Sequence, residues 1–152
     1  GAEVVAACDL AVASQRATFG FPEPRVGLAA TGGGALQRLA RELPMKHAMR
    51  LLLTGQPIPA QEAMRIGLVN EVVAHEDLMP AALALADEIL ACAPLAVQAT
   101  KQVVLRSLDM PDLASAMDES RYPAVRRMME SQDAVEGPLA FAQKRPPKWQ
   151  GR

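Results

Sequence analysis

The sequence predicts an α/β fold in which the second half of the chain is mostly helical. Three stretches have the short extended or alternating apolar pattern of strands, at residues 9–14, 17–20 and 68–73. In most of the chain after residue 35, apolar residues instead recur every three or four positions, which is the spacing of one helix face. With 152 residues, the chain suits one domain that can bury a core.

The elements expected before residue 35 are a helix, two short strands and a proline-containing turn. They occupy residues 1–8, 9–14, 17–20 and 22–24. The helix follows a glycine and packs alanines and valines inside, and the first strand places Leu10 and Val12 on one face. Pro22 and Pro24 exclude a helix around Glu23 and are expected to hold its backbone extended.

The elements expected after residue 35 are helices interrupted by one strand. The helices lie at residues 35–43, 44–54, 60–66, 78–89 and 94–108, and the strand at 68–73. Pro44 ends the first of these helices and suits the first turn of the next. Gly55 and Gly67 supply further helix stop signals.

The last long segment, residues 112–132, contains Pro123 and is either one kinked helix or two helices. An apolar stripe runs along it, made of Leu113, Met117, Ala124 and Met128. This stripe fits a core face, and an oligomer contact is the second interpretation. The prolines at 146 and 147 and the glycine at 151 predict a loose tail.

Composition excludes several classes of function. Hydrophobic residues make up 50% and the net charge is −1, which argues against disorder and against a nucleic-acid-binding surface. Aromatic residues are only 3%, so no stacking platform for single strands is expected. Because no apolar run is long enough to cross a bilayer and nothing resembles a signal peptide, we expect no membrane partner and a cytoplasmic location.

Cys8 and Cys92 are expected to be buried small apolar residues.

Two glutamates near the start of the chain are candidates for chemistry. Glu3 begins an apolar helix, Glu23 lies between two prolines, and a triple glycine follows at residues 32–34. A carboxylate in apolar surroundings is unfavourable unless it has a use, and a glycine-rich turn offers backbone N–H groups beside it. Spacing alone leaves a second interpretation open, in which Glu3 only complements a helix N-terminus and Glu23 lies in a solvated turn.

Short motifs run through nearly the whole chain in a fixed order. Up to residue 39 they are Gly1-Ala2-Glu3, Ala7-Cys8-Asp9-Leu10, Phe19-Gly20-Phe21-Pro22-Glu23, Gly27-Leu28 and the glycine run before Gln37-Arg38-Leu39. The later ones are Leu53-Thr54-Gly55, Ala60-Gln61-Glu62-Ala63, Gly67-Leu68-Val69-Asn70, Ala93-Pro94, Ala99-Thr100-Lys101, Asp133, Glu136-Gly137, Ala140-Phe141 and Lys144-Arg145. Together they resemble the enoyl-CoA hydratase/isomerase (crotonase) superfamily.

This resemblance implies the C-terminal part of a crotonase-type spiral α/β fold. Residues 1–73 would belong to the core that carries both glutamates, and residues 74–152 would form a helical region that contacts coenzyme A and assembles trimers or dimers of trimers. The family's pattern has further glycines and a large region before the position of Gly1, and the chain has no initiator methionine. We therefore expect it to be part of a longer enzyme.

The implied activity is that of an enoyl-CoA hydratase, which adds water syn to a trans-2-enoyl-CoA thioester and gives a 3-hydroxyacyl-CoA, as in fatty acid β-oxidation. No metal or redox cofactor is implied, since the substrate itself carries coenzyme A. Glu3 would orient or deprotonate the water that attacks C3, and Glu23 would deliver a proton to C2. We expect Phe19, Phe21 and Leu28 to bury Glu23. The presence of both glutamates favours a hydratase, because relatives that only isomerise often keep one or neither.

The resemblance also implies backbone donors and substrate contacts. The oxyanion hole would form at Gly1, through the N–H of the residue before it and a donor from a preceding region, and the N–H of Gly32 would hold the water. Losing one oxyanion donor costs about 10²–10³ in rate, so residues 1–152 alone are expected to be nearly inactive. The implied substrate-binding residues are Pro22, Gly27, Leu28 and Lys144. Lys144 matches a residue that contacts the adenine nucleotide end of coenzyme A, and a solvated lysine in a basic tail is the alternative.

Two other functions remain open from the sequence. In an enoyl-CoA isomerase, one glutamate would shuttle a proton between carbons and no water would add. In a non-catalytic oligomerisation module, the helical part would mainly build a trimer.

Overall fold

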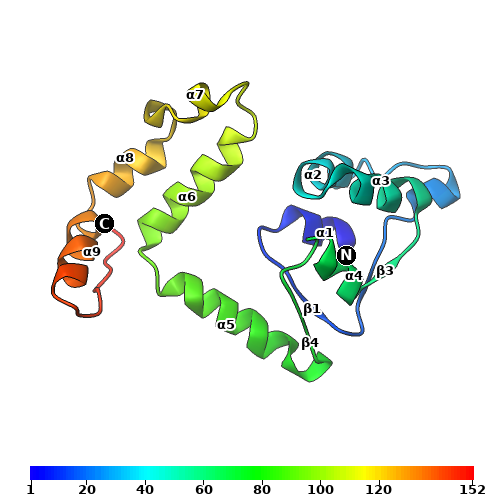
Figure 1. Cartoon of the computed structure of the whole chain (residues 1–152), viewed down its shortest axis with the longest axis horizontal. Helices are drawn as coiled ribbons and strands as arrows, with labels where there is room; N and C mark the ends of the chain where they lie inside the picture. Colours follow the sequence, from blue (N-terminus) through cyan, green and yellow to red (C-terminus); the bar gives the residue numbers. More distant parts are fainter. The chain divides into compact units, whose positions relative to one another are not determined.

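The computed structural model describes residues 1–152 and contains two compact units, Gly1–Ala84 and Leu85–Arg152 (Figure 1). The boundary between the units falls inside helix α5 (Leu78–Leu90). The roles assigned to residues 1–73 and 74–152 stay predictions.

The first unit combines short helices with two small sheets. Its helices are α1 (Ala2–Ala7), α2 (Ala35–Glu42), α3 (Met45–Thr54) and α4 (Ala60–Arg65), with the 3-10 helices η1 (Glu23–Val26) and η2 (His75–Asp77). Its strands are β1 (Val12–Ser14), β2 (Thr18–Phe19), β3 (Ile58–Pro59) and β4 (Glu71–Val73). Strand β1 pairs in parallel with β4, and β2 pairs antiparallel with β3.

One hydrophobic core holds the first unit together. Helix α1 packs against α2, and α2 packs against α3. Phe21 and Leu39 are the largest completely buried side chains in the chain, and Phe19 and Leu51 lie in the same cluster. Burial of such side chains is the main stabilising contribution to a unit of this size.

The second unit is entirely helical beyond α5. It contains α6 (Pro94–Ser107), α7 (Leu113–Ala116), the 3-10 helix η3 (Glu119–Arg121), α8 (Pro123–Met129) and α9 (Asp133–Ala142). Helix α8 packs along α6, as Figure 1 shows. Tyr122 is buried beside this contact, and its hydroxyl donates a 2.6 Å hydrogen bond to the carbonyl of Ala116.

Most of the helices predicted from the sequence are present in the structure. The prolines and glycines that were expected to begin and end them do so. Pro44 precedes α3 as its N-cap, and Gly55 ends that helix in the left-handed conformation with φ of 60°. Helix α9 is not among the helices expected from apolar spacing, and it lies in the helical region that the resemblance implies for residues 74–152.

The strands are shorter than the apolar patterns predict. The ladder joins only Val12–Ser14 to Glu71–Val73, and no strand covers residues 9–11 or 68–70. Leu68 and Val69 are buried but do not belong to a strand. Their apolar side chains therefore indicate burial in the core and not pairing within a sheet. Just before the ladder, the side chain of Asn70 accepts a 2.8 Å hydrogen bond from the N–H of Ala11.

The expectation that Pro22 and Pro24 exclude a helix is wrong. Glu23 begins the 3-10 turn η1, with Pro22 as the N-cap at φ −77° and ψ 0°. Proline is compatible with the first turn of a helix, because the N–H that it lacks has no partner there anyway. Gly27 ends the turn with φ of 78°, a conformation that favours glycine.

The segment 112–132 contains two α-helices, as the second alternative predicts, and a 3-10 turn lies between them. It divides into α7, η3 and α8, because Asp112 and Asp118 each begin a new turn by accepting the N–H of Ser115 and Ser120. As a result, the predicted core stripe is interrupted. Leu113 and Met117 are 74% and 70% exposed, and Ala124 and Met128 are only partly buried.

The two cysteines are exposed, which contradicts the expectation that they are buried. Cys8 is the C-cap of the short helix α1. Cys92 follows α5, a helix in which no residue is buried although most are apolar. The small size of cysteine permits burial but does not require it.

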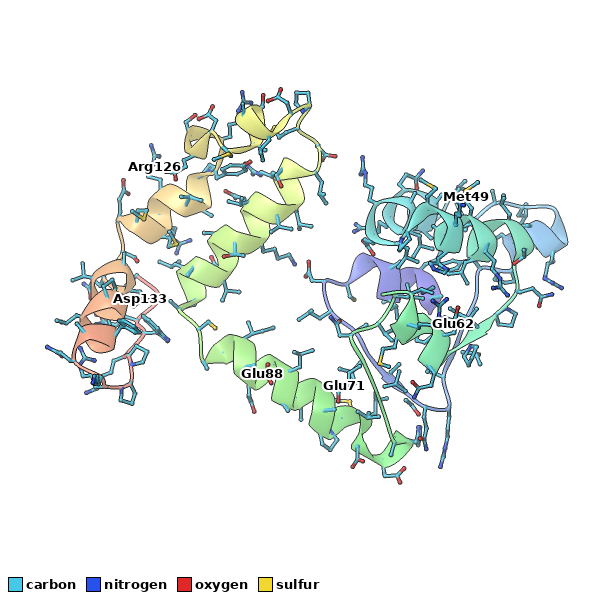
Figure 2. All side chains as sticks on the ribbon, viewed as in Figure 1. Met49, Glu62, Glu71, Glu88, Arg126 and Asp133 are labelled. Carbon is cyan, nitrogen blue, oxygen red and sulfur yellow. The ribbon has the colours of Figure 1, made fainter.

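The C-terminal tail is not loose. We call Asp133, Glu136 and residues 145–152 the C-terminal clasp, because the two carboxylates of α9 hold the tail. Asp133, labelled in Figure 2, is 5% exposed and accepts the N–H groups of Gln150 and Gly151 at 2.7 and 2.9 Å. Glu136 accepts two hydrogen bonds from Arg145, at 2.6 and 2.9 Å, and one from the N–H of Lys148 at 2.8 Å.

The clasp makes stability depend on pH. The Arg145 guanidinium and the Lys148 N–H lower the pKa of Glu136 from 4.5 to about 2. Ionised Glu136 therefore stabilises the fold above pH 4.5, and this contribution is lost as the pH falls toward about 2. We expect E136Q to reduce the difference in unfolding midpoint between neutral and acidic solution, measured by thermal unfolding at several pH values. Equal pH dependence in both proteins would exclude this role of Glu136.

No single helix is long and apolar enough to cross a membrane. The segments His75–Leu90 and Pro94–Ser107 reach that length and composition only together, and they are bent by 101° at the break between them.

Candidate active site

Glu3 is held by the glycine loop that precedes α2. It lies in the first turn of α1, and its Oε1 atom accepts a 3.2 Å hydrogen bond from the N–H of Gly33. The approach is so close that a Cβ on residue 33 would lie 2.9 Å from the Cβ, Cδ and Oε2 atoms of Glu3. Only glycine fits at this position, and the carboxylate is thereby fixed against a backbone donor.

Glu23 carries an unpaired buried oxygen. Its Oε2 atom is buried and has no hydrogen-bond partner. Buried polar atoms in proteins almost always have a partner, so an exception points to a functional use. A carboxyl oxygen of this kind can exchange a proton or a hydrogen bond with a ligand without first breaking an internal bond.

The turn that carries Glu23 is fixed to the end of α3. Arg25, two residues further along η1, donates a 3.0 Å hydrogen bond from Nε to the carbonyl of Thr54. A Cβ on the neighbouring Gly55 would lie 3.1 Å from the Cγ atom of Arg25. The stem of Arg25 therefore lies directly against this glycine, and η1 is anchored at a defined place.

The structure brings some of the predicted residues together and leaves others apart. Glu3 meets the glycine loop through Gly33, whereas a Cβ on Gly32 would meet nothing within 4 Å. Glu23 lies in the same unit as Glu3, and no hydrogen bond joins the two carboxyl groups. Gly1 is the exposed N-cap of α1.

The predicted substrate-binding residues are on the surface. Pro22 and Gly27 are exposed at the two ends of η1. Phe19 and Phe21 are buried as expected, but Leu28 is 67% exposed, so it does not help to enclose Glu23 as the sequence suggested. A leucine that directly follows the cap glycine of η1 is free to face solvent. Lys144 is exposed in the second unit.

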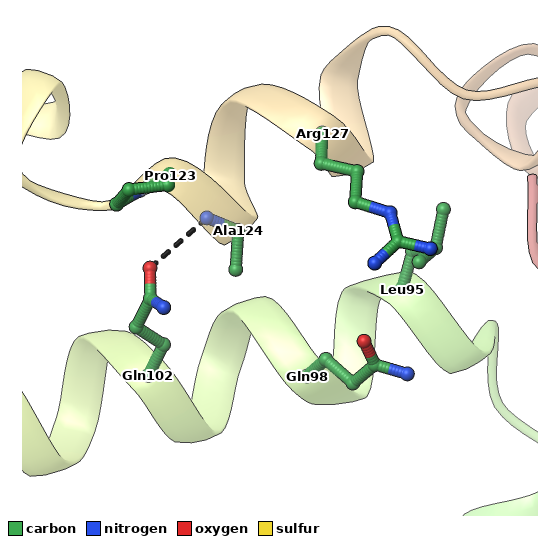
Figure 3. A pocket seen from close by; sticks show the side chains of 6 residues that line it. All are labelled: Leu95, Gln98, Gln102, Pro123, Ala124 and Arg127. Carbon is green, nitrogen blue, oxygen red and sulfur yellow. Dashed lines mark hydrogen bonds between the residues drawn. The ribbon is translucent and has the colours of Figure 1, made fainter.

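A hollow of about 320 Å³ lies in the second unit, where the sequence predicted no site. Figure 3 shows it between α6 and α8, with Gln98, Gln102 and Arg127 around it. Gln102 is already engaged, because its Oε1 atom accepts the N–H of Ala124 at 3.0 Å. None of its lining residues is a nucleophile or a carboxylate, so the hollow itself offers no general base.

Sequence reasoning missed Gly33 and Arg25. A run of three glycines marks a loop that can approach a ligand or side chain, but it does not tell which glycine makes the contact. Arg25 gave no signal at all, since its partner is a backbone carbonyl 29 residues away.

Comparisons with known proteins agree on one family. The family model for enoyl-CoA hydratase/isomerase matches residues 1–152. Carnitinyl-CoA dehydratase of Proteus mirabilis (strain HI4320) is 40% identical over 100% of this chain, and that of Escherichia coli (strain K12) is 39% identical over the same share. The chain spans 59% of the length of each of these two relatives.

Solved structures give the same result for the fold. The crystal structure of an enoyl-CoA hydratase from Mycobacterium marinum has a TM-score of 0.91 and 40% identity, covering 99% of this chain and 61% of that one. An enoyl-CoA hydratase from Mycobacterium tuberculosis H37Rv has a TM-score of 0.85 and 42% identity, covering 96% and 57%. The fold is therefore the crotonase-type α/β fold, matched over about three fifths of those chains. The chain belongs to the enoyl-CoA hydratase/isomerase family.

Proposed function

We propose that this chain is the catalytic C-terminal part of an enoyl-CoA hydratase, which adds water to a trans-2-enoyl-CoA thioester. The observation that carries the proposal is the buried, unpaired Oε2 atom of Glu23, in the same unit as a second carboxylate whose position is fixed by a backbone N–H. Membership of the family supports acyl-CoA thioesters as the substrate class.

In the proposed reaction, the two glutamates move protons in opposite directions. Glu3 accepts a proton from water as the water oxygen bonds to C3, and the π electrons shift toward C2 and the thioester carbonyl. Glu23 then gives its proton to C2, which completes the 3-hydroxyacyl-CoA. Proton transfer by a positioned side chain of this kind contributes about 10²–10⁴ in rate.

Backbone groups would position these reactants. The Gly33 N–H keeps the carboxylate of Glu3 oriented, and the neighbouring Gly32 N–H would hold the water. The thioester oxygen would be stabilised at the N-terminus of α1, next to Gly1. The exposed residues Pro22, Gly27 and Leu28 would contact the substrate beside Glu23, and Lys144 its nucleotide end.

A dehydratase is the second candidate, because the curated relatives are named as carnitinyl-CoA dehydratases. Dehydration is the same chemistry in reverse, in which the carboxyl groups exchange their acid and base roles. An isomerase of the same family would need only one of the two glutamates to shuttle a proton. The position of Glu3, fixed against the N–H of Gly33, supports a use for the second glutamate as well, and this favours a hydratase.

The test is a comparison of substrates with the protein at its natural length. A hydratase converts a trans-2-enoyl-CoA and leaves a 3-enoyl-CoA unchanged, whereas an isomerase interconverts the two. A preference for carnitinyl-CoA over a simple 3-hydroxyacyl-CoA would favour the dehydratase. Absence of turnover with all of these thioesters would contradict the proposed function and favour the non-catalytic module.

We further propose a homo-oligomer, a trimer or a dimer of trimers. The support is a set of large apolar side chains that are exposed in the second unit, namely Leu90, Val104, Leu108, Leu113 and Met117. Large apolar side chains that are exposed near one another commonly mark a contact with another chain. Sedimentation equilibrium at natural length should give the mass of three or six chains, and a monomer would exclude this assembly.

A further inference from the structure

The helix α9 ends in a turn that normally requires glycine, yet the residue there is a lysine. The N–H of Lys144 bonds to the carbonyl of Phe141, and the N–H of Arg145 bonds to that of Ala140, each at 3.1 Å. These two bonds define a Schellman motif, in which the residue at the position of Lys144 adopts the left-handed conformation. Lys144 has φ of 52° and is the only residue other than glycine with a positive φ.

A lysine in this conformation is strained, because its Cβ crowds the backbone. Strain of this kind persists only where the surrounding structure enforces it, and it often marks functional positions. Here the enforcing structure is the C-terminal clasp. Its hydrogen bonds to Asp133 and Glu136 fix the chain directly after Lys144, from Arg145 to Gly151.

The adjacent cations Lys144 and Arg145 have different surroundings. Both guanidinium contacts of Arg145 to Glu136 are short, so the charge of Arg145 is neutralised within the clasp. Lys144 is exposed and makes no side-chain hydrogen bond or ion pair. Its ammonium is therefore the free cation of the Lys144-Arg145 pair.

We propose that the clasp is a positioning device, in which Glu136 and Arg145 hold Lys144 in the left-handed conformation so that its ammonium meets the phosphates at the nucleotide end of the substrate. This rests on the proposed function, in which Lys144 contacts coenzyme A. Asp133 completes the device by fixing the far end of the tail, and Glu136 and Arg145 act through Lys144 without touching the substrate.

The test compares binding of a complete substrate with that of one lacking the nucleotide. The protein at its natural length and its variants K144G, K144Q, E136Q and K46Q are assayed with an enoyl-CoA and with the matching enoyl-pantetheine. We expect K144G and K144Q to raise KM for the enoyl-CoA about tenfold or more, the effect of one charge-assisted hydrogen bond, with little change in kcat. K144G should at the same time raise the thermal unfolding midpoint, because glycine relieves the strain.

For E136Q we expect a rise in KM of about threefold to tenfold for the enoyl-CoA only, since a misplaced contact loses part of its strength. The enoyl-pantetheine should be unaffected by every variant. Lys46 is an exposed lysine of α3 that belongs neither to the clasp nor to the proposed site. K46Q removes the same charge without altering the clasp, and its KM should stay close to that of the unchanged protein.

Three results would overturn the proposal. They are an equal effect of K46Q and K144Q, an unchanged KM for enoyl-CoA in E136Q, and equal losses with both substrates. If the protein turns over neither thioester, calorimetric binding of coenzyme A and pantetheine to the same variants decides instead. A nucleotide-dependent loss in K144Q and E136Q would then support the clasp although the hydratase function had failed, and no such loss would overturn it.

Discussion

Replacing Glu23 by glutamine is expected to lower kcat for hydration by about 10²–10⁴, with a smaller change in KM. Glutamine has nearly the same shape as glutamate, but its amide cannot deliver a proton to C2. The Oε2 atom of Glu23 makes no internal hydrogen bond that the substitution would break. Steady-state kinetics of E23Q with a trans-2-enoyl-CoA measures this effect.

A matched control is available on α4. Glu62, labelled in Figure 2, lies in the same unit and forms a surface ion pair with Arg65 at 2.6 Å. We expect E62Q to retain its rate, because an exposed pair of this kind contributes little to the fold. If E23Q is as active as E62Q, Glu23 is not the proton donor.

Replacing Gly33 by alanine is expected to lower kcat by about 10², although alanine has no chemistry of its own. The new methyl group would lie 2.9 Å from the Cβ, Cδ and Oε2 atoms of Glu3, closer than carbon and oxygen atoms approach. Since the Cβ of Glu3 is anchored to α1, the loop or the carboxylate must move. A displacement of about 1 Å at a catalytic group commonly costs about 10² in rate.

The neighbouring glycine provides the comparison for this variant. A Cβ on Gly32 would meet nothing within 4 Å, and an alanine there keeps its backbone N–H. The loss in G32A should therefore be much smaller than in G33A. Equal rates for G33A and the unchanged protein, at equal folded fraction, would show that the contact between Gly33 and Glu3 has no part in catalysis.

Those parts of the fold that depend on local signals could be predicted from the sequence. The limits of α3, for example, follow from Pro44 and Gly55, whose backbone preferences act within a few residues. The C-terminal clasp could not be predicted, since it depends on Asp133 and Glu136 accepting bonds from residues 9 to 18 positions away. The turn at Glu23 could not be predicted from its prolines, because proline both breaks helices and begins them.

In the candidate site, too, features with a local signal could be predicted and features that depend on distant residues could not. Glu3 and Glu23 stood out because carboxylates are rare in apolar or proline-bound surroundings. Their functional geometry could not be predicted. The hydrogen bond from Gly33 to Glu3 joins residues 30 positions apart, and the unpaired Oε2 atom of Glu23 depends on burial. Neither is present in any local pattern.

The most direct test of the hydratase function follows oxygen from the solvent. The protein at its natural length is incubated with a trans-2-enoyl-CoA in ¹⁸O-labelled water, and the product is analysed by mass spectrometry. We expect a 3-hydroxyacyl-CoA with one labelled oxygen, at a rate that falls strongly in E3Q and E23Q. A product that carries no solvent oxygen, or labelled product formed equally fast by both variants, would contradict the function proposed for these two glutamates.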